Sequence, residues 1–351
     1  MLTSILQPTS RWSTLLTRCL IRLMLLLRKP KLSPAAQPHD ALESLPSKLR
    51  QKFSISITRL SLALPSDWSD AKHWNPLLLS PLGHKPTKRT VFYMHGGAFI
   101  HMMSPFHWQT VARLSQDLEA DVAVQTYTLL PYAGIHDVIH KLVEVYRHVH
   151  AEAKKKGHEV IVAGDSAGGC LAASLTLALN DANLPVPDQL LLIAPVLDAE
   201  LTRPATRALQ HRDPWLKIDR LGHVGHFWSV GGSTERDVFL AVTAKKVGEP
   251  TKEQREAMRH PYASPILGDW SFYKGHITTI CGTSDILLAD SLELAAKAEQ
   301  QQPLDVTFIK AEGCIHVYPI LFGLPLARLL SRDSERGFEL MVQSVLRKSS
   351  V

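Results

Sequence analysis

Cysteine is scarce in this chain. The 351 residues include only four cysteines, Cys19, Cys170, Cys281 and Cys314, and no two of them form a Cys-x-x-Cys pair. A disulfide scaffold needs many closely spaced cysteines, and zinc or thioredoxin-like sites need paired ones. The sequence therefore argues against both classes, and we expect most of these residues to be buried thiols.

Acidic residues are missing from the first 39 positions, although that segment holds six basic ones: Arg11, Arg18, Arg22, Arg28, Lys29 and Lys31. The whole chain has a net charge of +6, so the remainder is neutral overall. Nucleic-acid binding needs an excess of Lys and Arg on a folded face, which a neutral remainder does not offer. With 45% hydrophobic and 21% charged residues the composition is that of a globular protein, and the length fits one large domain with insertions.

The sequence also lacks an uninterrupted apolar run long enough to cross a membrane near its start, because Arg18 and Arg22 divide the leucine-rich segment there. Wound as a helix, that segment places its arginines on one side and most of its leucines on the other. We predict that residues 1–35 form a basic amphipathic leader, whose residues 11–31 contact the surface of an intracellular membrane. A cleaved presequence and a cap helix packed on the protein are the alternatives.

Short apolar runs rich in β-forming residues alternate with helical stretches along the rest of the chain. The clearest helix spans residues 135–156, where apolar residues recur at helical spacing and a basic last turn precedes a glycine. This alternation predicts an α/β fold with a mostly parallel sheet covered on both faces. Residues 199–264 break the pattern and are predicted to be an insertion. The predicted strands are residues 90–94, 122–127, 160–163, 190–193, 277–281 and 306–309.

The sequence Gly-Asp-Ser-Ala-Gly at residues 164–168 directly follows one predicted strand and precedes a helical run over residues 171–179. In this context the serine occupies a sharp strand-to-helix turn, and the flanking glycines remove side chains that would collide there. The turn puts the hydroxyl at the carboxyl end of the strand, where open α/β sheets bind ligands, beside a helix N-terminus. We therefore predict that Ser166 is a nucleophile.

A serine nucleophile needs a general base, and the base needs an acid that orients it. Asp285 and His316 each follow one of the last two predicted strands, so the order serine, acid, histidine matches that of hydrolases on this architecture. We predict His316 as the base and Asp285 as the acid. Asp290 and Asp198 are the alternatives for the acid.

Consecutive glycines follow the strand at residues 90–94, in the sequence His95-Gly96-Gly97-Ala98-Phe99. Glycine lets backbone N–H groups turn toward a bound carbonyl oxygen. Together with the N–H of Ala167, this turn is predicted to form an oxyanion hole, in which one donor typically lowers the barrier by about 3 kcal/mol.

Taken together, the motifs at residues 95–97 and 164–169, Asp285 and His316 resemble the hormone-sensitive-lipase-like esterases of the α/β-hydrolase superfamily, over about residues 85–345. The resemblance implies an α/β-hydrolase domain over residues 36–351, with a helical cap formed by about residues 36–65 and 199–264. It implies a serine carboxylesterase that hydrolyses short-chain or acetyl esters of a hydrophobic alcohol through an acyl-enzyme. A small-molecule ester is then the partner, and no cofactor or metal is expected.

In that family the oxyanion amides belong to positions that match Gly97, Ala98 and Ala167, with Gly96 supporting the turn. The family usually has glycine where Ala98 stands, so substrates that are bulky near the acyl carbon are expected to react less well. The family's Tyr-Arg-Leu-Ala-Pro-Glu segment is degenerate here, at residues 127–132, and lacks its Arg and Glu.

Three aromatic residues of the insertion, Trp215, Phe227 and Trp228, either line an apolar substrate pocket or pack the cap. His136 and His140 share one helix face, but no third ligand is evident and a metal site is not expected. Two other functions stay open. One is deacylation of lipid or steryl esters at a membrane, or of amides; the other is ligand binding without catalysis, which an intact His316 disfavours. The sequence does not indicate the oligomeric state.

Overall fold

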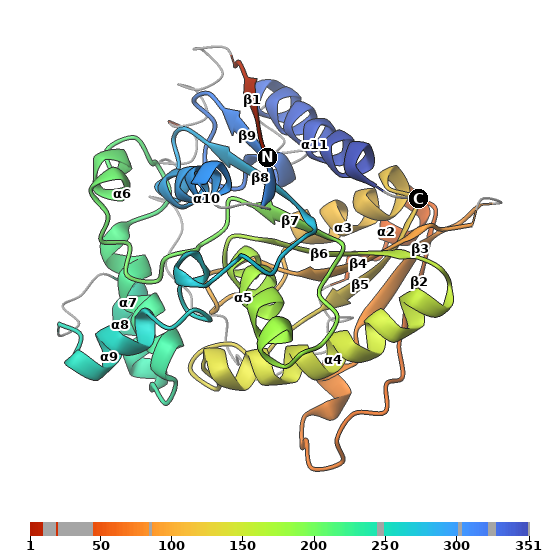
Figure 1. Cartoon of the computed structure of the whole chain (residues 1–351), viewed down its shortest axis with the longest axis horizontal. Coiled ribbons are helices and arrows are strands. Elements are labelled where there is room, and N and C mark those ends of the chain that lie inside the picture. The colour runs from red at the N-terminus through yellow and green to blue at the C-terminus, as the bar shows by residue number, and fades with distance from the viewer. Residues whose placement is uncertain are drawn as a thin grey trace.

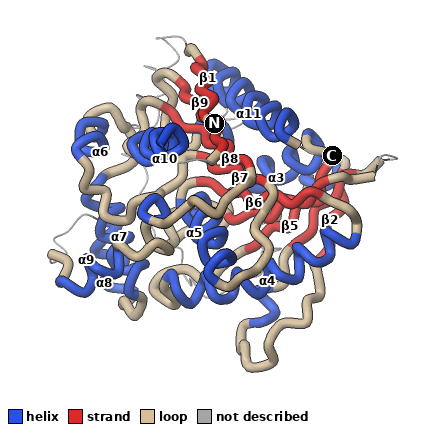
Figure 2. The backbone as a smooth tube through the Cα atoms, in the orientation of Figure 1, coloured by secondary structure: helices blue, strands red, loops and turns tan. Residues whose placement is uncertain are grey.

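The computed structural model of the protein describes residues 1–9, 19, 45–83, 86–243, 249–300, 304–321 and 328–349. These residues form one nine-stranded sheet with helices packed on both faces (Figure 1 and Figure 2). The strands are β1 (Leu2–Gln7), β2 (Ile55–Arg59), β3 (Leu77–Pro81), β4 (Arg89–Met94), β5 (Ala120–Gln125), β6 (Glu159–Asp165), β7 (Gln189–Ile193), β8 (His276–Gly282) and β9 (Asp305–Ala311).

The strands lie in the order β1-β9-β8-β7-β6-β4-β5-β3-β2. Strand β3 is antiparallel to both β2 and β5, and every other neighbouring pair is parallel. All six strands expected from the sequence are present, as β4 to β9. The predicted α/β class with a mostly parallel sheet is thereby confirmed.

Successive residues of each strand point to opposite sides of the sheet, so both faces carry apolar side chains, and helices pack on both of them. Phe92 and Met94 of β4 pack with helices α4 and α5, whereas Val91 and Tyr93 pack with helices α3 and α11. The helices are α2 (Leu49–Lys52), α3 (Pro105–Asp117), α4 (Ile135–Lys155), α5 (Ala167–Asp181), α6 (Pro204–Leu209), α7 (Ile218–Val230), α8 (Glu235–Thr243), α9 (Lys252–Met258), α10 (Leu288–Gln300) and α11 (Arg328–Lys348), with 3-10 turns η2 (Ala71–Trp74), η3 (Pro265–Leu267) and η4 (Tyr318–Ile320).

Helix α4 shows how directly the sequence determines some elements. Its apolar face, including Ile135, Ile139 and Leu142, is buried as the helical spacing predicted. The chain leaves the helix after Lys155, and Gly157 then adopts a φ of +71°, a conformation that favours glycine.

The insertion between β7 and β8 contains helices α6 to α9, which lie together on the left of Figure 1. Helix α7 packs against α8, α9 and α4. This helical layer is called the cap below, and it comprises residues 199–264.

Two boundaries drawn from the sequence are wrong. Leu2–Gln7, assigned to the leader, form β1, which pairs in parallel with β9 along its whole length. Ile55–Arg59, assigned to the cap, form β2, which pairs with β3. Both are edge strands, and their short, partly exposed sequences carry little of the apolar signal that marks the buried strands.

The rest of the predicted leader, including nearly all of residues 11–31, lies outside the described residues, so its contact with a membrane stays a prediction. Within the described ranges, no helix is both long and apolar enough to cross a membrane.

Candidate active site

Ser166 stands at the turn between β6 and α5, with a φ of 52° and a ψ of −114°. The close approach of the two elements explains the flanking glycines. A Cβ on Gly164 would overlap the carbonyl of Gly168, and a Cβ on Gly168 would overlap the carbonyl of Met94. The backbone thus holds Ser166 in a strained conformation that neighbouring side chains would prevent.

The structure brings Ser166, His316 and Asp285 into one hydrogen-bonded line. The Oγ of Ser166 lies 2.9 Å from Nε2 of His316, and Nδ1 of His316 lies 2.8 Å from Oδ2 of Asp285. Because the carboxylate can only accept, Nδ1 carries the proton, and Nε2 of the neutral ring accepts the serine O–H. All three residues are buried, and Ser166, at 8% exposure, is the most accessible of them.

The electrostatic surroundings favour a proton on His316. Burial alone would lower the pKa of this imidazole, but the charge of Asp285 and the hydrogen bond to it, helped by the charges of Asp213 and Asp165, raise the pKa above its usual value. An imidazole of this kind is able to take a proton from a hydroxyl and to hold it beside the carboxylate.

The alternative acids lie elsewhere. Oδ2 of Asp290 accepts the backbone N–H groups of Leu197 and Asp198, and Asp198 pairs with Arg203 at 3.2 Å. Burial raises the pKa of Asp290 to about 7. Of the three candidate acids, it is Asp285 that meets His316.

The backbone of the glycine turn after β4 lies in the left-handed region. Gly97 has a φ of +120°, Ala98 and Phe99 also have positive φ, and a Cβ at Gly97 would meet the backbone of His101. The N–H groups of Gly97, Ala98 and Ala167 donate to no other residue in the described ranges. The N–H of Gly96 differs, since it donates to Oδ1 of Asp165 at 3.0 Å. Gly96 therefore supports the turn, and its amide is not free for a ligand.

Asp165, beside the nucleophile position, is a residue whose role the sequence did not reveal. Its buried carboxylate accepts from the hydroxyl of Tyr93 at 2.5 Å, from the N–H of Gly96, and from Nε2 of His107 at 3.2 Å. Nδ1 of His107 accepts the N–H of Ser104 at 2.8 Å, so the proton of this ring is on Nε2. Burial would raise the pKa of Asp165, but these partners outweigh it and lower the pKa.

His95 is a structural part of the turn. Its Nδ1 donates to the carbonyl of Gly96 at 2.7 Å, its ring stacks on Tyr127 with centroids 4.7 Å apart, and the Tyr127 hydroxyl donates to the His95 carbonyl. Burial, with a smaller effect of His107, lowers the pKa of His95 to about 4. The ring is therefore neutral at physiological pH.

The three cap aromatics differ in their contacts. Trp215 presents its ring edge-on to His316, with centroids 5.7 Å apart and planes at 81°. Trp228 is buried and stacks on Phe99 of the glycine turn at 4.2 Å, so it packs the cap onto that turn. Phe227 stacks on His226 at 4.9 Å and is only half-buried. The geometry favours packing for Trp228, while a wall of the substrate pocket remains a prediction for the other two.

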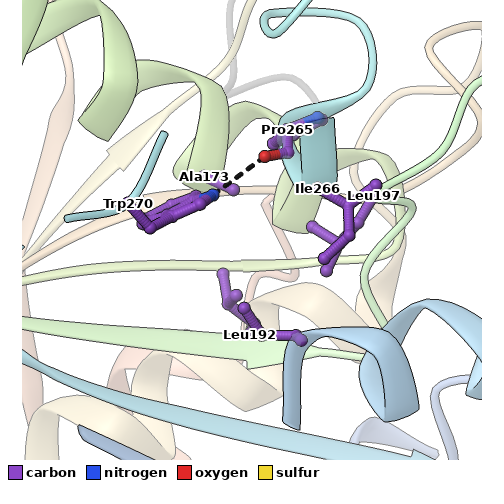
Figure 3. A pocket seen from close by; sticks show the side chains of 7 residues that line it. Ala173, Leu192, Leu197, Pro265, Ile266 and Trp270 are labelled. Atoms are coloured by element: carbon purple, nitrogen blue, oxygen red, sulfur yellow. Dashed lines mark hydrogen bonds between the residues drawn. The ribbon is translucent and has the colours of Figure 1, made fainter. Parts of the chain in front are cut away.

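An apolar cluster lies beside α5, between that helix, β7 and the turn η3 (Figure 3). The indole N–H of Trp270 donates to the carbonyl of Pro265 at 2.9 Å across it. The cluster leaves no space for a molecule of the size of water, so it is packed core and not a substrate site. Its members are Ala173, Leu192, Leu197, Pro265, Ile266, Trp270 and Leu294.

The two histidines that share one helix face, His136 and His140, lie on α4. The ring of His136 lies against that of His260 on α9's C-terminal side, with centroids 4.7 Å apart. No group of three His, Cys, Asp or Glu side chains able to hold a metal is found in the part of the chain that the structure describes.

The profile of a known family matches residues 91–320, and that family is described by its α/β hydrolase fold. The chain belongs to this family. An esterase of Acinetobacter venetianus is 27% identical over 211 residues, which are 60% of this chain and 61% of that protein. The hormone-sensitive lipase of Mus musculus is 28% identical over 158 residues, which are 43% of this chain but only 21% of the lipase.

Solved structures agree with this assignment at the level of the fold. A hormone-sensitive lipase from a metagenome library superposes with a TM-score of 0.66 at 20% identity, covering 92% of this chain and 98% of that one. The resemblance to hormone-sensitive-lipase-like α/β hydrolases drawn from the sequence motifs is thereby confirmed.

Proposed function

We propose that the protein is a serine carboxylesterase, in which Ser166 is the nucleophile, His316 the general base and acid, and Asp285 the residue that orients the imidazole. The observation that carries this proposal is the hydrogen-bonded line from Oγ of Ser166 to Oδ2 of Asp285. It runs beside backbone N–H groups that have no acceptor within the described residues.

The reaction follows from this geometry. Oγ of Ser166 attacks the carbonyl carbon of an ester while its proton passes to Nε2 of His316, and the oxygen that becomes negative is held by the amides of Gly97, Ala98 and Ala167. When the tetrahedral intermediate collapses, the bond to the alcohol breaks and the alcohol leaves with the proton from Nε2. Water, deprotonated by His316 in turn, then attacks the acyl carbon. The bond to Oγ breaks, His316 returns the proton to Oγ of Ser166, and the acid is released.

The charge of Asp285 stabilises the imidazolium that exists between these proton transfers. A ligand-binding protein without catalysis would not need this aligned line of proton donor and acceptors, so the alignment favours the enzyme.

Short-chain or acetyl esters of a hydrophobic alcohol are the proposed substrates. Support comes from the family and from the aromatic cap, where Trp215 stands against the imidazole from which the leaving alcohol takes its proton. A series of nitrophenyl esters of increasing acyl length, with and without liposomes, separates this preference from deacylation of lipids at a membrane.

The decisive test replaces the hydroxyl. Ser166→Ala should lower kcat for nitrophenyl acetate by about 10⁴-fold or more, because a triad without its nucleophile retains only the oxyanion hole and binding. Ser174→Ala is the matched control. Ser174 is a buried serine within α5, and among the described residues its hydroxyl bonds to the carbonyls of Cys170 and Tyr262 and to the thiol of Cys170.

In the parent protein, a fluorophosphonate should modify the peptide that contains Ser166. Labelling of a different serine, or full activity of Ser166→Ala, would overturn the assignment.

A further inference from the structure

Asp213 is a buried acid of the cap, in the segment between α6 and α7. Among the described residues, its carboxylate accepts three hydrogen bonds, all from backbone N–H groups. Oδ1 accepts from Trp215 at 2.7 Å and from Leu216 at 2.8 Å, and Oδ2 accepts from Ile286 at 2.9 Å. One side chain thus ties the cap to the residue directly after Asp285.

Two consecutive amides after β8 are divided between two carboxylates. The N–H of Ile286 goes to Asp213, and the N–H of Leu287 goes back to Oδ1 of Asp285 at 2.9 Å. Asp285 also receives the thiol of Cys281 on Oδ2 at 3.5 Å. The position of Asp285 therefore depends on a loop that Asp213 holds from the cap side.

The carboxylate of Asp213 also positions Trp215, the cap residue whose ring lies next to the imidazole of His316. By accepting the N–H groups of Trp215 and Leu216, Asp213 closes a tight turn of the kind that aspartate commonly makes. The ring of Trp215 leaves this turn to meet His316 edge-on. A side chain without an acceptor at position 213 would release both the turn and the ring.

The negative charge of Asp213 also acts on His316. Burial and the nearby charge of Asp285 raise the pKa of Asp213 to about 6, so its carboxyl is ionised at pH 8. The acids that act on His316 are Asp285 from the loop after β8, Asp213 from the cap and Asp165 from β6. The neighbouring Cys281 stays a neutral thiol, because burial raises its pKa well above the ordinary value.

We propose that Asp213 is a positioning residue of the reaction: it fixes the loop that carries Asp285, holds Trp215 against His316, and supplies a second negative charge that stabilises the imidazolium. The proposal rests on the serine esterase function proposed above. Asp213 does not take part in bond making, and it acts on the ester only through His316 and Asp285.

The test compares four variants by the pH dependence of kcat and kcat/KM for nitrophenyl acetate. D213N and D213S remove the charge, and the serine of D213S still offers an acceptor to the turn. D213E keeps the charge on a longer side chain. D219N is the matched control, because Asp219 is an exposed cap acid six positions further on.

Both neutral variants should lower kcat at pH 8 by about tenfold with little change in KM, and should move the acid limb of kcat/KM to lower pH. The direction follows because the imidazolium loses one of its stabilising charges. D213E should keep the acid limb of the parent even where kcat falls, and D219N should match the parent throughout.

An acid limb that stays in place in D213N and D213S would overturn the proposal, because a merely structural residue changes stability without moving that limb. Failure of both neutral variants to fold, with D213E folded, would also overturn it, since the charge would then serve the fold. A parent protein that hydrolyses no ester and takes no fluorophosphonate label at Ser166 would instead refute the proposed function itself.

Discussion

Asp165 offers the sharpest test of how the glycine turn is held. Its carboxylate accepts hydrogen bonds from three parts of the chain: the Tyr93 hydroxyl of β4, the Gly96 N–H of the turn, and Nε2 of His107 on α3. Asparagine has the same shape but only one acceptor oxygen. In either orientation of the amide, its NH₂ group faces at least one of these donors.

The magnitude follows from this arrangement. If the amide oxygen in D165N still accepts the hydrogen bonds from Tyr93 and Gly96, the N–H of His107 is left buried without an acceptor. Such a group lowers the free energy of unfolding by about 1–3 kcal/mol. The remaining bonds lose the extra strength that a charged acceptor gives, so we expect D165N to be less stable by about 2–4 kcal/mol in total. A looser turn should lower kcat by roughly tenfold to a hundredfold, less than the loss of a complete oxyanion donor.

The assay combines urea unfolding with kcat for nitrophenyl acetate, both at pH 8. D290N is the control, because Asp290 is an equally buried acid that accepts two backbone amides but does not touch the turn. D290N should keep the kcat of the parent. The reasoning is refuted if D165N is destabilised as expected and yet turns over nitrophenyl acetate at the rate of the parent, since the tether would then not align the amides.

Two further predictions concern Ala98 and Asp290. Ala98→Gly removes a methyl group from a residue with a φ of 52° and leaves its N–H in place, so the free energy of unfolding should change by no more than about 1 kcal/mol. The ratio of kcat/KM for isobutyrate esters to kcat/KM for acetate esters should rise, and an unchanged ratio would show that the Ala98 methyl does not limit the acyl group. Burial raises the pKa of Asp290 to about 7, so the folded state holds a proton that the unfolded state releases near pH 4. Through this group alone, the free energy of unfolding should therefore fall by on the order of 2–3 kcal/mol from pH 5 to pH 8. The stability of D290N, measured by urea unfolding at both pH values, should decline less over that range than the stability of the parent, and an equal decline would contradict the shift.

The sequence predicted the buried strands and indicated the residues at their carboxyl ends, because both leave a local pattern of residue types. Strands β4 to β9 are largely buried on both faces, so each contains a short run of mostly apolar residues. The turn after β6 needs glycine because a Cβ on Gly164 or Gly168 would overlap neighbouring backbone atoms. Because parallel strands end at one edge of the sheet, the glycine-flanked turn and the positions of Asp285 and His316 after their strands predicted that these side chains would meet Ser166, and in the structure the three side chains are in contact.

The remaining parts depend on contacts that no local pattern encodes. Asp165 and Asp213 matter because of backbone amides far from them in the chain, and a lone aspartate beside a serine or a proline gives no sign of which amides it will meet. Trp228 is buried because it meets Phe99 across more than a hundred residues, and only the packed cap shows this. Strands β1, β2 and β3 were missed because all three are only partly buried, and β1 and β2 each have a neighbour on one side alone.

The pairing of β1 with β9 sets the order in which this sheet can be completed. Leu2 meets Val306, so the strand must wait, without its backbone partner, until nearly all of the rest has been synthesised. Its docking then shields the open hydrogen-bonding side of β9, which would otherwise be free to recruit a strand from another molecule. The pairing that completes this edge of the sheet therefore cannot form before β9, which follows β8 and precedes His316 in the chain, has been synthesised.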